Sequence, residues 1–118
     1  MAKVLVVDDA AFMRMRCSRF LHEKGHEVVE AGDGDQAVKL YQEVRPDAVL
    51  LDVTMPRMDG LTALKEIKKI DPRARVAMVT AMGQQGVVVE ALKSGARDFV
   101  MKPFEADRLI AALDRILS

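Results

Sequence analysis

The sequence predicts an α/β domain in which a single doubly wound sheet of five parallel strands is flanked by five helices. Two observations support this fold class. Short apolar runs of strand length alternate along the chain with segments whose apolar residues recur at i, i+3, i+4 and i+7. Most of the strand-length runs are continuously apolar, which is typical of parallel strands covered on both faces. Regular alternation of strand and helix builds βαβ units and therefore a parallel sheet.

The predicted strands occupy residues 3–7, 27–31, 48–51, 76–79 and 98–101. Each segment between or after them has an apolar face at helical spacing, which we expect to pack on the sheet. These inner faces comprise Met13, Cys17, Phe20 and Leu21 in the first helix, Ala37, Leu40, Tyr41 and Val44 in the second, Leu61, Leu64 and Ile67 in the third, Val88, Ala91 and Leu92 in the fourth, and Leu109, Ala112, Leu113 and Ile116 in the fifth.

Residues that start or stop helices mark the same divisions. Gly25 follows the first helix, Pro46 the second, and Gly95 closes the fourth. Asp59 is placed to cap the amino terminus of the third helix, and Pro72 follows that helix. The sequence shows no repeat, linker or low-complexity segment.

Length and composition exclude several classes of protein. The 118 residues fit one domain, which would bury roughly two thirds of its unfolded surface. The 18 basic and 18 acidic residues cancel and are scattered, so the chain lacks the concentrated positive field that nucleic acid or an anionic membrane requires. No apolar stretch is long enough for a signal peptide or a membrane span. We therefore expect a cytoplasmic protein without a nucleic-acid or membrane partner.

Polar side chains stand at the carboxyl ends of four predicted strands. Asp8 and Asp9 follow the first run, Asp52 the third, Thr80 the fourth and Lys102 the fifth. Parallel strands end at the same edge of the sheet, so we expect these side chains to converge. Three carboxylates together would repel one another without a hard cation such as Mg²⁺, and a hydroxyl and an ammonium suit phosphoryl oxygens. The cluster predicts a metal-assisted phosphoryl-transfer site.

Most of these residues also have ordinary structural explanations. Asp8 and Asp9 could cap the first helix, because Asp is a favoured N-cap residue. Asp52 could form an Asx turn, since residues 52–60 contain Pro and Gly and form a predicted loop. Thr80 could simply end a strand, where β-branched residues are common.

Lys102 is harder to explain as a solvated surface charge. It closes an apolar run and is followed directly by Pro103 and Phe104. Its ammonium is a compact point charge suited to a phosphoryl or carboxylate oxygen. The bond between Lys102 and Pro103 can adopt the cis form.

Together these positions resemble the receiver domain of bacterial two-component response regulators over the whole chain, residues 1–118. Residues 8–14 and 80–85 are also similar to the CheY group, the stand-alone chemotaxis regulators of that family. The resemblance implies a flavodoxin-like sheet with strand order 2-1-3-4-5, an order that the residue spacing alone does not predict. It rests on the pair Asp8 and Asp9, on Asp52 before Met55, Pro56 and Gly60, on Thr80 before Ala81, and on Lys102 before Pro103 and Phe104.

The resemblance implies that a histidine kinase of the CheA type phosphorylates Asp52. It further implies that Mg²⁺ is held by Asp9, Asp52 and the backbone carbonyl of Thr54, with Asp8 acting through metal-bound water. Such a protein catalyses its own phosphorylation and dephosphorylation without turning over an external substrate. Thr54 and Met82 match two positions that tune loss of the phosphoryl group, and neither side chain can orient an attacking water, so we expect slow self-dephosphorylation without a phosphatase.

The resemblance also implies a conformational switch. Lys102, the Thr80 hydroxyl and the Ala81 backbone N–H would contact the phosphoryl oxygens. In the family, phosphorylation moves this threonine and rotates inward an aromatic residue of the last strand, a position that Phe99 matches. Many members have Tyr there, so Phe99 lacks a hydroxyl that could bond a partner, and an ordinary core Phe is the alternative explanation. Gly83 and Gly86 lie where the fourth helix should begin, and each weakens a helix by roughly 1 kcal/mol relative to Ala, which predicts a mobile end.

Output would pass to a protein partner that binds the fourth helix, fifth strand and fifth helix. In chemotaxis, the implied partners are a flagellar motor switch protein and a phosphatase, and we expect a monomer. Alternatives are a receiver in another phosphorelay and a binding module that ignores phosphorylation. A flavodoxin-like electron carrier is disfavoured because Asp8 and Asp9 would repel its phosphate, and a haloacid-dehalogenase-type phosphatase because its nucleophile follows its first strand.

Overall fold

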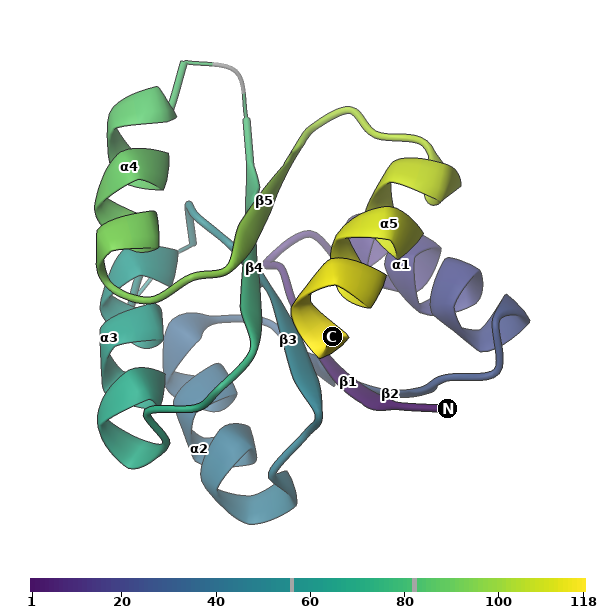
Figure 1. Cartoon of the computed structure of the whole chain (residues 1–118), viewed down its shortest axis with the longest axis horizontal. Coiled ribbons are helices and arrows are strands. Elements are labelled where there is room, and N and C mark those ends of the chain that lie inside the picture. Colours follow the sequence, from purple (N-terminus) through teal and green to yellow (C-terminus); the bar gives the residue numbers. More distant parts are fainter. Residues whose placement is uncertain (56, 82) are drawn as a thin grey trace.

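The computed structural model describes residues 1–55, 57–81 and 83–118. Helices lie on both faces of a central sheet (Figure 1). The strands are β1 (Lys3–Val7), β2 (Glu27–Ala31), β3 (Ala48–Asp52), β4 (Val76–Thr80) and β5 (Asp98–Met101). The helices are α1 (Ala11–Glu23), α2 (Gly34–Val44), α3 (Gly60–Ile70), α4 (Gln85–Lys93) and α5 (Ala106–Leu117).

All neighbouring strands pair in parallel, and their order in the sheet is β2-β1-β3-β4-β5. This confirms the predicted fold class and strand order. Strands β1 and β3 are neighbours although α1, β2 and α2 separate them in sequence, and the chain continues from β3 toward β4 and β5 on the other side. The carboxyl ends of β1 and β3 therefore flank the point at which the winding reverses, where open α/β sheets place their ligands.

Two apolar clusters account for the continuously apolar strands. Side chains alternate between the faces, so Leu5 and Val7 of β1 join one cluster, and Val4 and Val6 join the other. The first cluster packs against α2, α3 and α4, and the second against α1 and α5. Strands β1, β3 and β4 are covered on both sides, so the alternation of polar and apolar residues typical of a one-sided sheet is absent from their sequences.

The helix boundaries follow local backbone chemistry. The Asp59 Oδ1 accepts a hydrogen bond of 2.8 Å from the Thr62 backbone N–H, which confirms the predicted cap of α3. Gly25 and Gly95 follow α1 and α4 with φ of 84° and 107°, a left-handed conformation that favours glycine. Among the described residues, no helix is both long enough and apolar enough to span a membrane.

Three details differ from the sequence expectations. Strands β3 and β4 each extend one residue further, so Asp52 and Thr80 are the last residues of strands rather than the first residues of loops. Leu92 was expected on the inner face of α4, but it is 42% exposed. The helical spacing alone predicted that face wrongly, because Val88 and Ala91 suffice to pack this short helix on the sheet.

Candidate functional site

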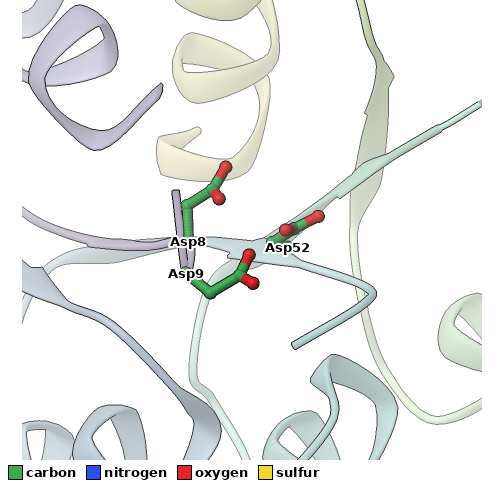
Figure 2. A group of neighbouring side chains, drawn as sticks. All are labelled: Asp8, Asp9 and Asp52. Carbon is green, nitrogen blue, oxygen red and sulfur yellow. The ribbon is translucent and has the colours of Figure 1, made fainter. Parts of the chain in front are cut away.

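Three carboxylates meet at the carboxyl end of the sheet. Asp8 and Asp9 lie in the loop after β1, and Asp52 ends β3. One carboxylate oxygen from each residue lies within 4.8 Å of the others, and Figure 2 shows the three side chains grouped at this edge. Asp8 and Asp52 are buried, whereas Asp9 is exposed. The convergence expected from the sequence is therefore present, with one acid open to solvent and two enclosed by protein.

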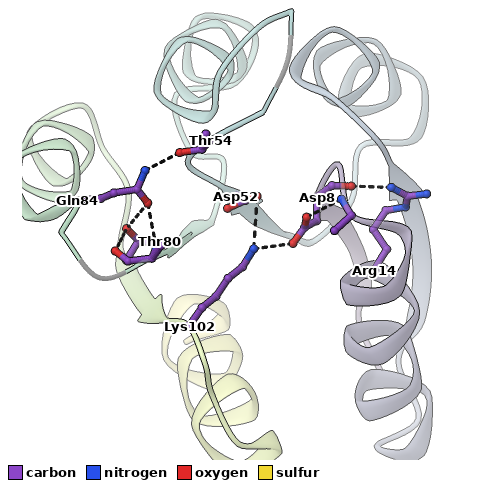
Figure 3. Close-up of polar contacts among 9 residues, drawn as sticks. Asp8, Arg14, Asp52, Thr54, Thr80, Gln84 and Lys102 are labelled. Carbon is purple, nitrogen blue, oxygen red and sulfur yellow. Dashed lines mark hydrogen bonds and ion pairs between the residues drawn. The ribbon is translucent and has the colours of Figure 1, made fainter.

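Lys102 joins the two buried carboxylates. Its Nζ lies 2.9 Å from Asp8 Oδ2 and 3.5 Å from Asp52 Oδ2 (Figure 3). Its backbone N–H donates to the Thr80 carbonyl oxygen at 2.7 Å, which fixes the loop after β5 against the end of β4. The bond between Lys102 and Pro103 is cis. The ammonium thus lies between both acids, as its position after β5 predicted.

The charges of the site do not balance. Burial and the neighbouring Asp8 raise the pKa of Asp52 to about 6, although Lys102 acts in the opposite direction. Burial by itself would lower the pKa of Lys102, but its hydrogen bond to Asp8 and the charge of Asp52 raise it above the ordinary value. One ammonium among three carboxylates leaves net negative charge, so the site favours an added cation.

The donor set fits Mg²⁺. Three carboxylate oxygens within 4.8 Å of one another are hard ligands, and the exposed Asp9 leaves one side open to the waters that Mg²⁺ retains. Thr54 lies in the loop directly after β3, two residues after Asp52. The predicted ligand set of Asp8, Asp9, Asp52 and the Thr54 carbonyl is compatible with this placement, and each individual role stays a prediction.

The alternative explanation of Asp8 as the N-cap of the first helix is wrong. The N-cap residue of α1 is Ala10, and no side chain caps that helix. Instead, Asp8 Oδ1 accepts a hydrogen bond of 2.9 Å from the Ala10 N–H, which holds the short loop between β1 and α1. The other Asp8 oxygen, Oδ2, contacts Lys102. Asp8 therefore shapes the loop and takes part in the charge cluster at the same time.

Two further residues hold the acidic loops, and sequence reasoning did not assign them this task. The Arg14 Nη1 donates to the Asp8 carbonyl oxygen at 2.6 Å, and its Nε donates to Glu30 Oε1 at 3.2 Å. A Cβ added to Gly60 would lie 2.0 Å from the Asp52 carbonyl oxygen. Only glycine therefore fits where α3 begins against the end of β3. The sequence marked Gly60 as a loop residue, but no local signal shows a contact across eight residues.

Thr80 and Ala81 form a second polar group at this edge. The Thr80 hydroxyl lies 3.1 Å from Gln84 Oε1, and the Ala81 backbone N–H donates to the same oxygen at 2.9 Å (Figure 3). The Gln84 Nε2 donates in turn to the Thr54 hydroxyl. Sequence reasoning noted Gln84 only as part of the motif shared with chemotaxis regulators. The structure shows that it connects the loops that follow β3 and β4.

Phe99, the predicted switch residue, is partly buried and packs against the cluster beneath α2, α3 and α4. It also borders an apolar groove together with Thr80, Val88 and Leu92. The groove therefore extends from Thr80, at the polar edge, to the surface of α4. Pro56 and Met82, which entered the motif and the expectation on dephosphorylation, lie outside the described residues.

Comparisons with known proteins agree with the fold. The family model of the response regulator receiver domain matches residues 4–114. The chain is 55% identical over 117 residues to the chemotaxis protein CheY of Bacillus subtilis, and the match covers 98% of each. A chain of the CheX-CheY-BeF3-Mg complex from Borrelia burgdorferi matches with a TM-score of 0.93 at 34% identity, over 98% of this chain and 89% of that one.

A crystal structure of the receiver domain of NtrX from Brucella abortus has a TM-score of 0.93 at 40% identity, with 97% of both chains covered. In a longer NtrX structure, this chain spans 27% of the length. The family model, the similar sequences and the similar structures thus agree, and the chain belongs to the response regulator receiver domain family.

Proposed function

We propose that this chain is an Mg²⁺-dependent phospho-acceptor of a two-component system, phosphorylated on Asp52 by a histidine kinase. The observation that carries the proposal is the position of the Asp52 carboxylate. It ends a buried strand beside Asp8 and Asp9, with the Lys102 ammonium 3.5 Å away. A carboxylate in this setting can act as a nucleophile while its neighbours neutralise an incoming phosphoryl group.

In the proposed reaction, an Asp52 carboxylate oxygen attacks phosphorus as the bond from phosphorus to the kinase histidine nitrogen breaks. With a pKa of about 6, Asp52 is mostly ionised at neutral pH and can attack without first losing a proton. Lys102, already beside Asp52, would pair with a phosphoryl oxygen. The Thr80 hydroxyl and Ala81 N–H would donate to others. Bound Mg²⁺ would supply positive charge that offsets repulsion between the carboxylates and the phosphoryl oxygens.

The biological setting that we propose is chemotaxis. Support comes from the 55% identity to Bacillus subtilis CheY over nearly the full length of both chains. On this basis, residues 1–118 form one receiver domain that acts as a cytoplasmic monomer. Its partners are a CheA-like kinase and a flagellar motor switch protein that binds the surface of α4, β5 and α5. The similarity to the NtrX receiver keeps another phosphorelay as the second candidate.

We further propose that the phosphoryl group is lost slowly without a phosphatase. Thr54 has no carboxylate or amide with which to orient an attacking water, and its hydroxyl already accepts the hydrogen bond from Gln84. In the similar structure from Borrelia burgdorferi, CheY is in complex with a second protein, CheX. This is compatible with a separate protein partner that acts on the site of this chain. The side chain at position 82 lies outside the described residues.

The test is the intact mass of the protein after incubation with acetyl phosphate, with and without Mg²⁺. The native chain should gain one phosphoryl group only in Mg²⁺, and Asp52→Asn should gain none. Asp107→Asn is the matched control, because Asp107 is an exposed carboxylate in the first turn of α5 and is not one of the three clustered acids. It should gain the phosphoryl group as the native chain does. No adduct in the native chain would instead favour a binding module that ignores phosphorylation.

A further inference from the structure

We propose that Gln84 is a latch that occupies the phosphoryl-binding donors of the unphosphorylated protein and must leave them when Asp52 is phosphorylated. The inference rests on the proposed function, because the competing ligand is the phosphoryl group on Asp52. It assigns to Gln84 a regulatory role in setting how readily the phosphorylated state forms.

The latch is a bridge between two loops. Gln84 Oε1 lies 2.9 Å from the Ala81 nitrogen and 3.1 Å from the Thr80 hydroxyl oxygen. From the other end of the same amide, Nε2 donates to the Thr54 hydroxyl. Both ends of one side chain are thus satisfied, and they hold the loop after β4 against the loop after β3 (Figure 3). The Gln84 side chain is half-buried in this position.

The two donors that Gln84 engages are the ones proposed to bind phosphoryl oxygens. A backbone N–H and a hydroxyl each carry a single proton, and a proton aimed at Gln84 Oε1 is not aimed at a phosphoryl oxygen. Thr80 is 1% exposed, so water does not readily replace the protein acceptors of its hydroxyl, which are Gln84 Oε1 at 3.1 Å and the Ala81 carbonyl oxygen at 3.2 Å. The Ala81 N–H is exposed, and Gln84 Oε1 is the acceptor that it engages. The amide oxygen and the phosphoryl oxygen therefore compete, and binding of the second requires displacement of the first.

An ordinary helix-capping role does not explain this side chain. Gln84 is the N-cap residue of α4, but its side chain makes no hydrogen bond to the backbone of that helix. Its polar atoms point back to Thr80, Ala81 and Thr54 instead. The next residue, Gln85, is exposed and makes no side-chain hydrogen bond to any described residue. The chain therefore offers two adjacent glutamines, of which only one is placed to compete.

Displacement of the latch would also affect the output side of the domain. Gln84 immediately precedes α4, so release of its side chain frees the amino-terminal end of that helix from the loops that follow β3 and β4. Val88, Leu92 and Phe99 border the apolar groove beside this end. Phosphorylation would thereby change the groove by removing a restraint, which biases a two-state element without a new contact to the helix itself.

The experiment measures the affinity for beryllofluoride, a non-hydrolysable phosphoryl mimic, by isothermal titration calorimetry in saturating Mg²⁺. Gln84→Ala should bind it about threefold to tenfold more tightly than the native chain, as expected from releasing donors that each contribute one modest net hydrogen bond. Gln85→Ala should match the native chain within about twofold. Thr54→Val, which removes only the far end of the bridge, should give a smaller increase in affinity than Gln84→Ala.

A second readout tests the latch without any ligand. Amide hydrogen exchange at Ala81 should be faster in Gln84→Ala than in the native chain, because its N–H loses its acceptor, and unchanged in Gln85→Ala. Equal affinity of native and Gln84→Ala, or weaker affinity of the variant, would overturn the latch while the proposed function stands. A native chain that binds no beryllofluoride in Mg²⁺ would overturn the proposed function and the latch together. If Gln84→Ala does not fold, an unchanged affinity in Thr54→Val overturns the latch.

Discussion

Removing the charge of Asp52 should stabilise the metal-free protein at neutral pH. Burial and Asp8 raise the pKa of this carboxyl from 3.8 to about 6, so the folded state disfavours its ionised form. The shift of about two units corresponds to about 3 kcal/mol at pH 7.5, where the group is ionised in both states. Asn has nearly the same size without the charge, but it loses the attraction of Lys102 at 3.5 Å. We expect Asp52→Asn to raise the free energy of unfolding by about 1–3 kcal/mol.

The pH dependence has a definite sign. A carboxyl whose folded-state pKa is raised contributes stability that is fully present below its unfolded value and is lost as pH rises through its folded value. This contribution should therefore disappear between about pH 4 and 6, and the native chain and Asp52→Asn should differ least near pH 4. At pH 7.5 the variant should melt about 4–10 °C higher.

The assay is urea unfolding in EDTA, followed by far-UV circular dichroism at several values between pH 4 and 8. Asp107→Asn is the control, because it removes an exposed carboxylate at the start of α5. Loss of this favourable charge at a helix amino terminus should cost about 0.3–1 kcal/mol, the opposite sign. Equal or lower stability of Asp52→Asn at pH 7.5, with no change in pH dependence, would refute the electrostatic reasoning for the site.

Three further substitutions and one control variant test neighbouring parts of the structure. Lys102→Met leaves the acids without their ammonium and should slow phosphorylation by acetyl phosphate about a hundredfold, measured by intact mass; an unchanged rate would contradict its role. Gly60→Ala should destabilise the fold by more than about 2 kcal/mol in urea, because its Cβ would meet the Asp52 carbonyl oxygen at 2.0 Å. Gly86→Ala is the control, because a Cβ added there would meet no atom within 4 Å, and it should be neutral or stabilise the fold by up to about 1 kcal/mol. Equal changes in the free energy of unfolding for Gly60→Ala and Gly86→Ala would refute the steric argument. Thr54→Asn should shorten the lifetime of the phosphorylated protein, followed by loss of the adduct mass, because an amide can orient water.

The sequence by itself determined the layered architecture. Leu5, Leu50 and their neighbours form runs too apolar to face water on either side, so the strands had to be buried between helices. The same logic located the cluster. Side chains that follow parallel strands meet at one edge regardless of the intervening sequence, so the sequence alone groups Asp8, Asp52 and Lys102, which the structure places together.

The strand order came from resemblance to a family, because alternation of strand and helix is compatible with several orders. The exposure of Leu92 depended on how much of α4 the sheet covers, which helical spacing does not show. These features depend on where each helix lies relative to the sheet. Only packing between distant segments decides that placement.

The finer geometry of the site was decided by the tertiary structure alone. Gln84 meets Thr54 across thirty residues, and Gly60 abuts the Asp52 carbonyl because one loop folds back on the end of its own strand. Sequence patterns show which residues share a face or an edge, since the periods of helix and strand are fixed by the backbone. They do not show the path of a loop, because loop conformation depends on side-chain hydrogen bonds that form only when distant segments have been brought together.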